Sequence, residues 1–105
     1  MVIWPPQNPI TTKEGKRLSI DCSTEDHSST MKWYKRTKGV DRELNSSLII
    51  NKDKVVHSIH HGIKTVRFMN VGKNDSGIYV CKKHGSLSGE KFLQKRFVLV
   101  VLGEF

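Results

Sequence analysis

The residues able to do chemistry in this 105-residue chain include five histidines, two cysteines and ten carboxylates. Three histidines, His57, His60 and His61, lie close together in the sequence and are of the type that zinc favours. A zinc site requires three or four ligands with supporting hydrogen bonds, and no cluster of cysteines or carboxylates accompanies these histidines. His60 and His61 also precede Gly62, as residues of a turn do. We therefore expect solvated histidines, with no metal ion and no cofactor.

The sequence contains none of the patterns typical of a catalytic centre. The eight glycines are scattered and form no phosphate-binding loop. No pair of carboxylates and no Ser-His-Asp context stands out as acid-base or nucleophilic machinery. We therefore predict that the protein is not an enzyme and that it acts by binding.

The elements that must position these side chains are short segments of alternating apolar and polar residues, separated by turn residues. Within them, Cys22 and Cys81 bracket Trp33, and the second cysteine ends the run Asp-Ser-Gly-Ile-Tyr-Val-Cys at 75–81. Eight or nine such segments indicate an antiparallel sandwich. Alternation predicts that the following residues face its interior: Leu18, Ile20, Cys22, Met31, Trp33, Val66, Phe68, Tyr79, Cys81, Phe97, Leu99 and Val101.

These residues resemble the immunoglobulin fold over about residues 14–102. The resemblance implies an all-β, two-sheet Greek-key sandwich with one disulfide, Cys22–Cys81, between its sheets. It also implies a core signature of Trp33, Asp75, Gly77 and Tyr79. Trp33 would pack on the disulfide, Tyr79 would hydrogen-bond backbone at a corner, and Asp75 would pair with a basic residue in the segment 52–54.

Within this family the chain is most similar to the intermediate (I-set) or V-like type. The segment 9–15 resembles the second half of a split first strand, and residues 66–71 with the run at 75–81 resemble the intermediate set. The interval between the cysteines is short for a full variable domain and long for a constant one. No glycine bulge interrupts 97–102, which argues against a rearranged antigen receptor.

Length and cysteine content predict one domain in an oxidising compartment. We expect a single domain over residues 1–102, with 103–105 as a linker or cloning remnant. A disulfide would persist outside the cell, so we expect an extracellular segment cut from a longer precursor. The alternative is an intracellular filament domain whose cysteines are reduced. No run of apolar residues is long enough to span a membrane.

The chain carries 18 lysines and arginines against 10 acidic residues, a formal net charge of +8. This excess favours an acidic partner, either a protein surface or a sulfated glycan, over nucleic acid. Alternation gathers basic and aromatic side chains on the outer side of the sheet that contains Trp33. The candidate partner-binding face consists of Lys32, Tyr34, Arg36, Lys82, Arg96 and Val98. The loop end formed by 25–29 and 85–89 is the other candidate contact surface.

These observations predict a recognition domain of a cell-surface receptor or adhesion protein that binds a protein ligand or counter-receptor. Self-association into a homodimer is compatible with it. A heparin-binding module of a growth-factor or interleukin-type cytokine receptor, and a structural domain of an intracellular filament, are the alternatives. Two acceptor patterns, at Asn45 and Asn74, predict N-glycosylation.

Overall fold

The computed structural model describes residues 1–25, 30–44, 54–57, 62–84 and 93–103, with 54–57 described by their backbone alone. Nine strands and one 3₁₀ turn are present in these ranges. They are β1 (Val2–Trp4), β2 (Ile10–Lys13), β3 (Leu18–Ser23), β4 (Thr30–Thr37), β5 (Val40–Glu43), β6 (Lys54–His57), β7 (Ile63–Phe68), η2 (Lys73–Asp75), β8 (Gly77–His84) and β9 (Leu93–Leu102). Within the described ranges, no helix is long and apolar enough to cross a membrane.

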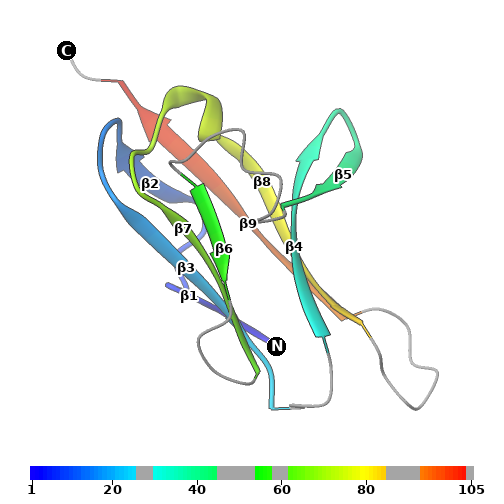
Figure 1. The fold of residues 1–105 in the computed structure, drawn as a ribbon. Helices are drawn as coiled ribbons and strands as arrows, with labels where there is room; N and C mark the ends of the chain where they lie inside the picture. The colour runs from blue at the N-terminus through cyan, green and yellow to red at the C-terminus, as the bar shows by residue number, and fades with distance from the viewer. Residues whose placement is uncertain (26–29, 45–53, 58–61, 85–92, 104–105) are drawn as a thin grey trace.

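The strands form two sheets that face each other (Figure 1). The four-stranded sheet has the order β1-β3-β7-β6, and the five-stranded sheet has the order β2-β9-β8-β4-β5. The first strand is split between the sheets: β1 pairs antiparallel with β3, whereas β2 pairs in parallel with β9. The predicted all-β sandwich with one disulfide between its sheets is confirmed.

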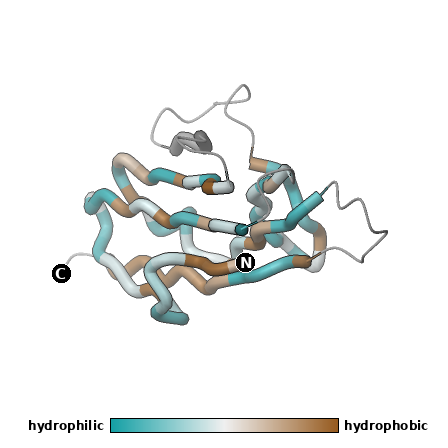
Figure 2. The backbone as a smooth tube through the Cα atoms, turned by 90° about the horizontal axis from the view of Figure 1, so that it is seen from below, coloured by the Kyte–Doolittle hydropathy of each residue, from teal (hydrophilic) through white to brown (hydrophobic). Residues whose placement is uncertain are grey.

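The core lies between the two sheets and is built from the inward residues of their strands. Hydrophobic and hydrophilic residues alternate along the chain, as Figure 2 shows. This pattern buries one side of each strand and leaves the other toward water. Of the twelve residues predicted to face inward, eleven are buried and Leu18 packs against them partly buried. Ile10, Val71 and Val80 are buried as well.

The hairpin from β4 to β5 is tight. Its pairing begins at Thr37 and Val40, across the two residues Lys38 and Gly39. Both have positive φ, 51° and 76°, as a type I′ turn requires. The turn fixes the register of β5, so that Asp41 lies opposite Arg36.

The last strand is longer than the apolar run that predicted it. β9 begins at Leu93, four residues before Phe97, and these extra residues pair with β8 from Val80 to Lys83. They are exposed and therefore carry no hydrophobic alternation. Backbone pairing extends the strand where side-chain burial does not.

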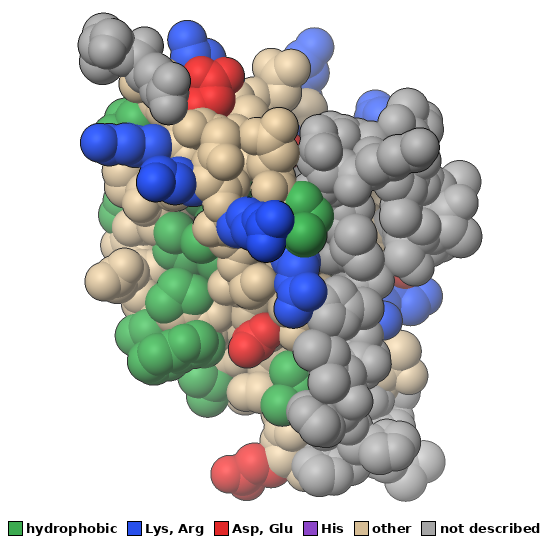
Figure 3. Space-filling view, turned by 60° about the vertical axis from the view of Figure 1, so that its left-hand side comes forward, with side chains coloured by type: hydrophobic (Ala, Val, Ile, Leu, Met, Phe, Trp, Pro, Cys, Tyr) green, Lys and Arg blue, Asp and Glu red, His purple; other side chains and the backbone are tan. Residues whose placement is uncertain are grey.

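The four-stranded sheet has an exposed apolar edge. Val2 and Trp4 on β1 are 60% and 63% exposed. Figure 3 views the molecule from the left-hand side of Figure 1 and shows hydrophobic side chains gathered there beside a row of lysines and arginines. The Trp4 side chain is thus mostly in contact with solvent, whereas Trp33 is fully buried.

Candidate recognition face

The residues of the predicted core signature hold the inner side of the five-stranded sheet against the other sheet. Cys22 on β3 and Cys81 on β8 are joined by a disulfide with a Cα–Cα separation of 6.5 Å, which links the two sheets. Trp33 lies in the register position opposite Cys81, and its Nε1 donates to the Lys64 carbonyl across the core at 3.0 Å. Its ring packs edge-on against Phe97 with centroids 5.6 Å apart. The indole thus forms a second connection between the sheets.

The corner before β8 is held by Tyr79. Its hydroxyl donates to the Asp75 carbonyl at 2.5 Å, and burial raises the pKa of the phenol above its ordinary range. The Asp75 carboxylate accepts the Gly72 amide N–H at 2.8 Å. The expected partner of Asp75 in 52–54 lies outside the described side chains. Gly77 has a φ of 151°, and a Cβ there would stand 3.3 Å from Lys35 Cε, so glycine suits this position.

The strand registers bring the six predicted contact residues onto one outer face, here called the recognition face. Lys32 lies opposite Lys82, and Tyr34 lies opposite Val80. Val80 in turn lies opposite Arg96. Directly opposed residues share a face of the sheet, so β4, β8 and β9 all contribute to this surface. The recognition face therefore consists of Lys32, Tyr34, Arg36, Lys82, Arg96 and Val98.

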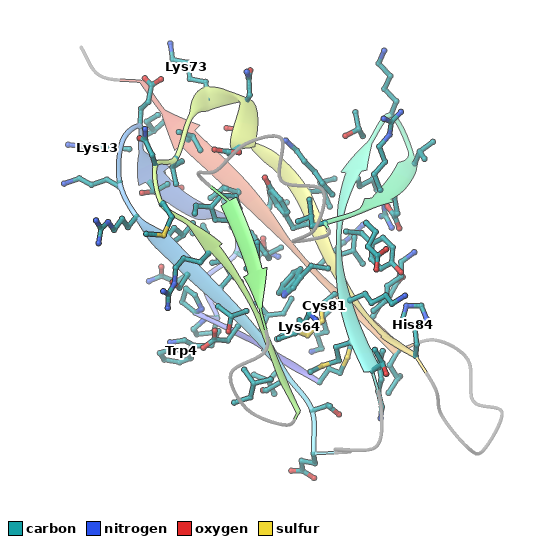
Figure 4. The ribbon with its side chains drawn as sticks, in the orientation of Figure 1. Trp4, Lys13, Lys64, Lys73, Cys81 and His84 are labelled. Carbon is teal, nitrogen blue, oxygen red and sulfur yellow. A yellow bond between two sulfur atoms is a disulfide. The ribbon has the colours of Figure 1, made fainter. Side chains whose placement is uncertain are left out.

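Tyr34 is fixed near the centre of the recognition face. The Lys82 ammonium lies 4.6 Å from the centroid of its ring, within the range of a cation–π contact. Its hydroxyl is 3.2 Å from His84 Nε2. His84 lies at the far end of β8, whereas Cys81 lies between the sheets (Figure 4). The tyrosine ring is thus held from two sides by residues of one neighbouring strand.

Two acidic residues that were not predicted to contribute also lie on this face. Asp41 accepts two hydrogen bonds from the Arg36 guanidinium, at 2.7 and 3.1 Å, and its carboxylate is 2.9 Å from Lys82 Nζ. Glu43 is 3.5 Å from Lys32 Nζ. The hydrogen bonds from Arg36 and Lys82 hold the pKa of Asp41 well below its usual range, and the bond to Asp41 raises the pKa of Arg36. The register set by the Lys38-Gly39 turn is the signal that could have located these residues.

The centre of the face is apolar beneath this charged layer. Val80 points to the outer side, yet its side chain is fully buried and lies outside the core cluster. Val98 is half-buried, and its backbone N–H donates to Asn8 Oδ1 at 3.0 Å. Arg96 is exposed, and no ion pair to it is found among the described residues. The face therefore has an apolar floor, one ordered aromatic ring and charges of both signs.

The family model described as "Immunoglobulin domain" matches residues 2–84 of the sequence. The chain belongs to the immunoglobulin domain family. The neuronal immunoglobulin domain-containing protein rig-3 of Caenorhabditis elegans is 34% identical over 103 residues, which cover 90% of this chain and 20% of that protein. This immunoglobulin domain therefore spans about a fifth of the length of that relative.

Solved structures with this fold are similar at low sequence identity. The ZIG-8 IG1 homodimer superposes with a TM-score of 0.70 at 17% identity, over 95% of this chain and 83% of the other. The ZIG-8–RIG-5 IG1–IG1 heterodimer gives 0.70 at 18%, over 93% and 84%. Titin A168–A169 gives 0.69 at 13%, over 91% and 45%. At these identities the likeness concerns the fold.

The pH dependence of stability is expected to depend on Asp41. Because its pKa is lowered in the folded state, its contribution is present above the unfolded pKa of about 4 and is lost as the pH falls toward the folded value. We expect Asp41→Asn to lower the urea midpoint at pH 7, and the difference from the wild type to shrink below about pH 4. Glu43→Gln, which loses one longer contact, should cause a smaller drop at pH 7. A difference that widens in acid would contradict this assignment.

Of the two glycosylation candidates, Asn74 can be located. It lies in the 3₁₀ turn η2, and its residue is exposed, so a glycan on it would extend into solvent. We expect secretory expression of the Asn45→Gln variant to yield a glycan that a peptide N-glycosidase removes, as mass spectrometry would show. Adding Asn74→Gln should abolish the modification, whereas Ser76→Thr should preserve it. An unmodified Asn45→Gln protein would refute the assignment.

Several other predicted residues lie outside the described part of the chain. They include Asn45, His60, His61, the side chain of His57, and the loop-end segments 26–29 and 85–89. Among the residues that are described, no group of three or more histidines, cysteines and carboxylates is arranged to hold a metal ion.

Proposed function

We propose that this domain is an extracellular recognition domain that binds a protein partner through the recognition face. The observation that carries the proposal is the fixed position of Tyr34, between Lys82 over its ring and His84 at its hydroxyl. Tyrosine and arginine are enriched among the residues that dominate binding energy at protein interfaces. An ordered ring loses less side-chain entropy on binding than a mobile one.

The charges on the recognition face favour a second immunoglobulin domain as the partner. The face carries Asp41 and Glu43 next to its lysines and arginines. A second copy of the face, related by a two-fold axis, could therefore place its carboxylates against the cations of the first. Two structures with the same fold are an IG1 homodimer and an IG1–IG1 heterodimer. These assemblies support a domain–domain contact, with either the same or a different chain.

The disulfide supports the extracellular location. Such bonds persist in oxidising compartments and are rare in the cytosol. The filament alternative requires Cys22 and Cys81 to be reduced, and the likeness to titin concerns the fold. The heparin alternative is not favoured on the recognition face, because Lys32, Arg36 and Lys82 are each paired with a carboxylate there.

Truncation of Tyr34 tests the proposal. The wild-type domain would be assayed for self-association by sedimentation and for binding to displayed extracellular immunoglobulin domains. Tyr34→Ala is expected to weaken the complex about 30-fold, the loss typical of a dominant interface residue. Its urea midpoint should change little, because the ring is not part of the core cluster.

A second variant tests the charges of the same face. Arg96→Glu reverses an exposed charge that forms no ion pair with another described residue, so it should weaken binding with little change in thermal stability. Trp4→Ala, on the other sheet, is the matched aromatic control and should bind as the wild type does. Unchanged affinity in both face variants, or the absence of any immunoglobulin partner including the domain itself, would overturn the proposal.

A further inference from the structure

Five exposed cations gather away from the recognition face. They are Lys13, Lys16, Arg17, Arg67 and Lys73, and we refer to them as the basic row. None of them forms an ion pair with another described residue. This separates them from Lys32, Arg36 and Lys82, each of which is paired with a carboxylate on its own sheet.

Lys13 and Lys73 lie at the same end of the sandwich, where the chain leaves β9 (Figure 4). Lys13 lies opposite Leu102 in the parallel pair of β2 and β9. A Cβ on Gly103 would stand 2.7 Å from Lys73 Cε, so the stem of Lys73 lies directly over the residue that follows Leu102. Figure 4 shows both lysines at this end of the molecule.

Backbone pairing continues the row along the four-stranded sheet. The Lys16 carbonyl accepts the Val71 amide N–H at 2.9 Å, which places Lys16 beside the segment that leads to Lys73. Arg17 immediately precedes β3, and Arg67 lies opposite Ser19 in the β3–β7 pair. Arg17 and Arg67 are therefore diagonal neighbours on the outer side of this sheet. A row of lysines and arginines is visible on this side in Figure 3.

The carboxylates near the row do not balance it. Glu14 lies between Lys13 and Lys16 and is half-buried. The Asp75 carboxylate, two residues beyond Lys73, accepts the Gly72 amide N–H. Five cations against Glu14 and Asp75 still leave a local excess of positive charge, and such a surface attracts a polyanion over several ångströms at physiological salt.

We infer that the basic row is a binding site for a sulfated glycan, separate from the protein-binding recognition face. A linear polyanion matches a line of unpaired cations, because each successive sulfate can meet another side chain. The disulfide places the domain in an oxidising compartment, where sulfated polysaccharides are the polyanions it would meet, rather than nucleic acid. Since the row and the face lie on different parts of the sandwich, the domain can hold a glycan and a protein together.

A charge-matched pair of variants tests this site. The row variant carries Lys16→Gln, Arg17→Gln and Lys73→Gln. The control carries Lys38→Gln, Arg42→Gln and Lys95→Gln, which are also exposed and remove the same formal charge. Affinity for heparin would be measured over a range of salt concentrations. We expect about a tenfold loss and a shallower salt dependence in the row variant, and less than a twofold loss in the control.

Further probes separate the glycan from other polyanions. Heparin stripped of its sulfates should bind the wild type far more weakly than heparin. Equal losses in the two variants would overturn the inference, because they would mean attraction to net charge alone. Tighter row-dependent binding to a DNA duplex or to phosphatidylserine vesicles would overturn it as well. The row variant should keep Tyr34-dependent protein binding, so failure of this site and failure of the recognition face are distinguishable.

Discussion

Replacement of Trp33 by alanine is expected to lower the free energy of unfolding by about 3–5 kcal/mol, the cost of removing a large buried aromatic side chain. Trp33 is fully buried, packs against Phe97 and donates to the Lys64 carbonyl. The substitution leaves a cavity and deprives that carbonyl of its donor. Urea unfolding followed by far-UV circular dichroism measures the loss.

The chain offers a matched control in its other tryptophan. Trp4 is 63% exposed on β1, so Trp4→Ala removes the same atoms from a site that is mostly in water. We expect it to change stability by less than about 0.5 kcal/mol, as surface substitutions usually do. Comparable losses in the two variants would contradict the assignment of Trp33 to the core.

Removal of the disulfide is expected to cost about 4 kcal/mol, because the bond closes a loop with a sequence separation of 59 residues and thereby limits the unfolded chain. Small domains have a total stability of about 5–15 kcal/mol, so at least about a quarter of the free energy of unfolding would be lost. The Cys22→Ala, Cys81→Ala variant should unfold at a much lower urea concentration than the wild type. The wild type measured in a thiol reductant should fall to a similar midpoint.

Two measurements bear on the disulfide directly. Thiol titration of the native protein should find no free thiol, since no cysteine is unpaired. A wild-type midpoint that is unchanged by the reductant would contradict both the stabilising role of the bond and the argument for an extracellular location.

The sandwich could be predicted from the sequence because burial leaves a direct pattern in it. Met31 and Trp33 alternate with Lys32 and Tyr34, and the structure places the first pair inside and the second pair on the outer side. Strand ends were less predictable. The residues from Leu93 to Arg96 are exposed, so they carry no periodic signal, although their backbone completes β9.

The outer face was predictable only in part. Alternation within each strand gives the side to which Lys32 and Arg36 point, but it does not give the neighbour across the sheet. That neighbour depends on the Lys38-Gly39 turn, which brings Asp41 opposite Arg36. Asparagine or aspartate before glycine is the usual sign of such a turn. Because lysine occupies that position here, the sequence did not indicate the turn. The surface predicted to be basic and aromatic therefore also carries carboxylates that pair with its cations.

The parallel pairing of β2 with β9 has a mechanical consequence. These strands lie toward opposite ends of the chain and run in the same direction. Tension applied to the two ends pulls the strands lengthwise past each other and strains their shared hydrogen bonds together rather than one after another. If that ladder ruptures, the covalent link from Cys22 to Cys81 still prevents the enclosed segment from extending. Under traction, we therefore expect only the segments outside the Cys22–Cys81 loop to extend once the β2–β9 ladder has ruptured.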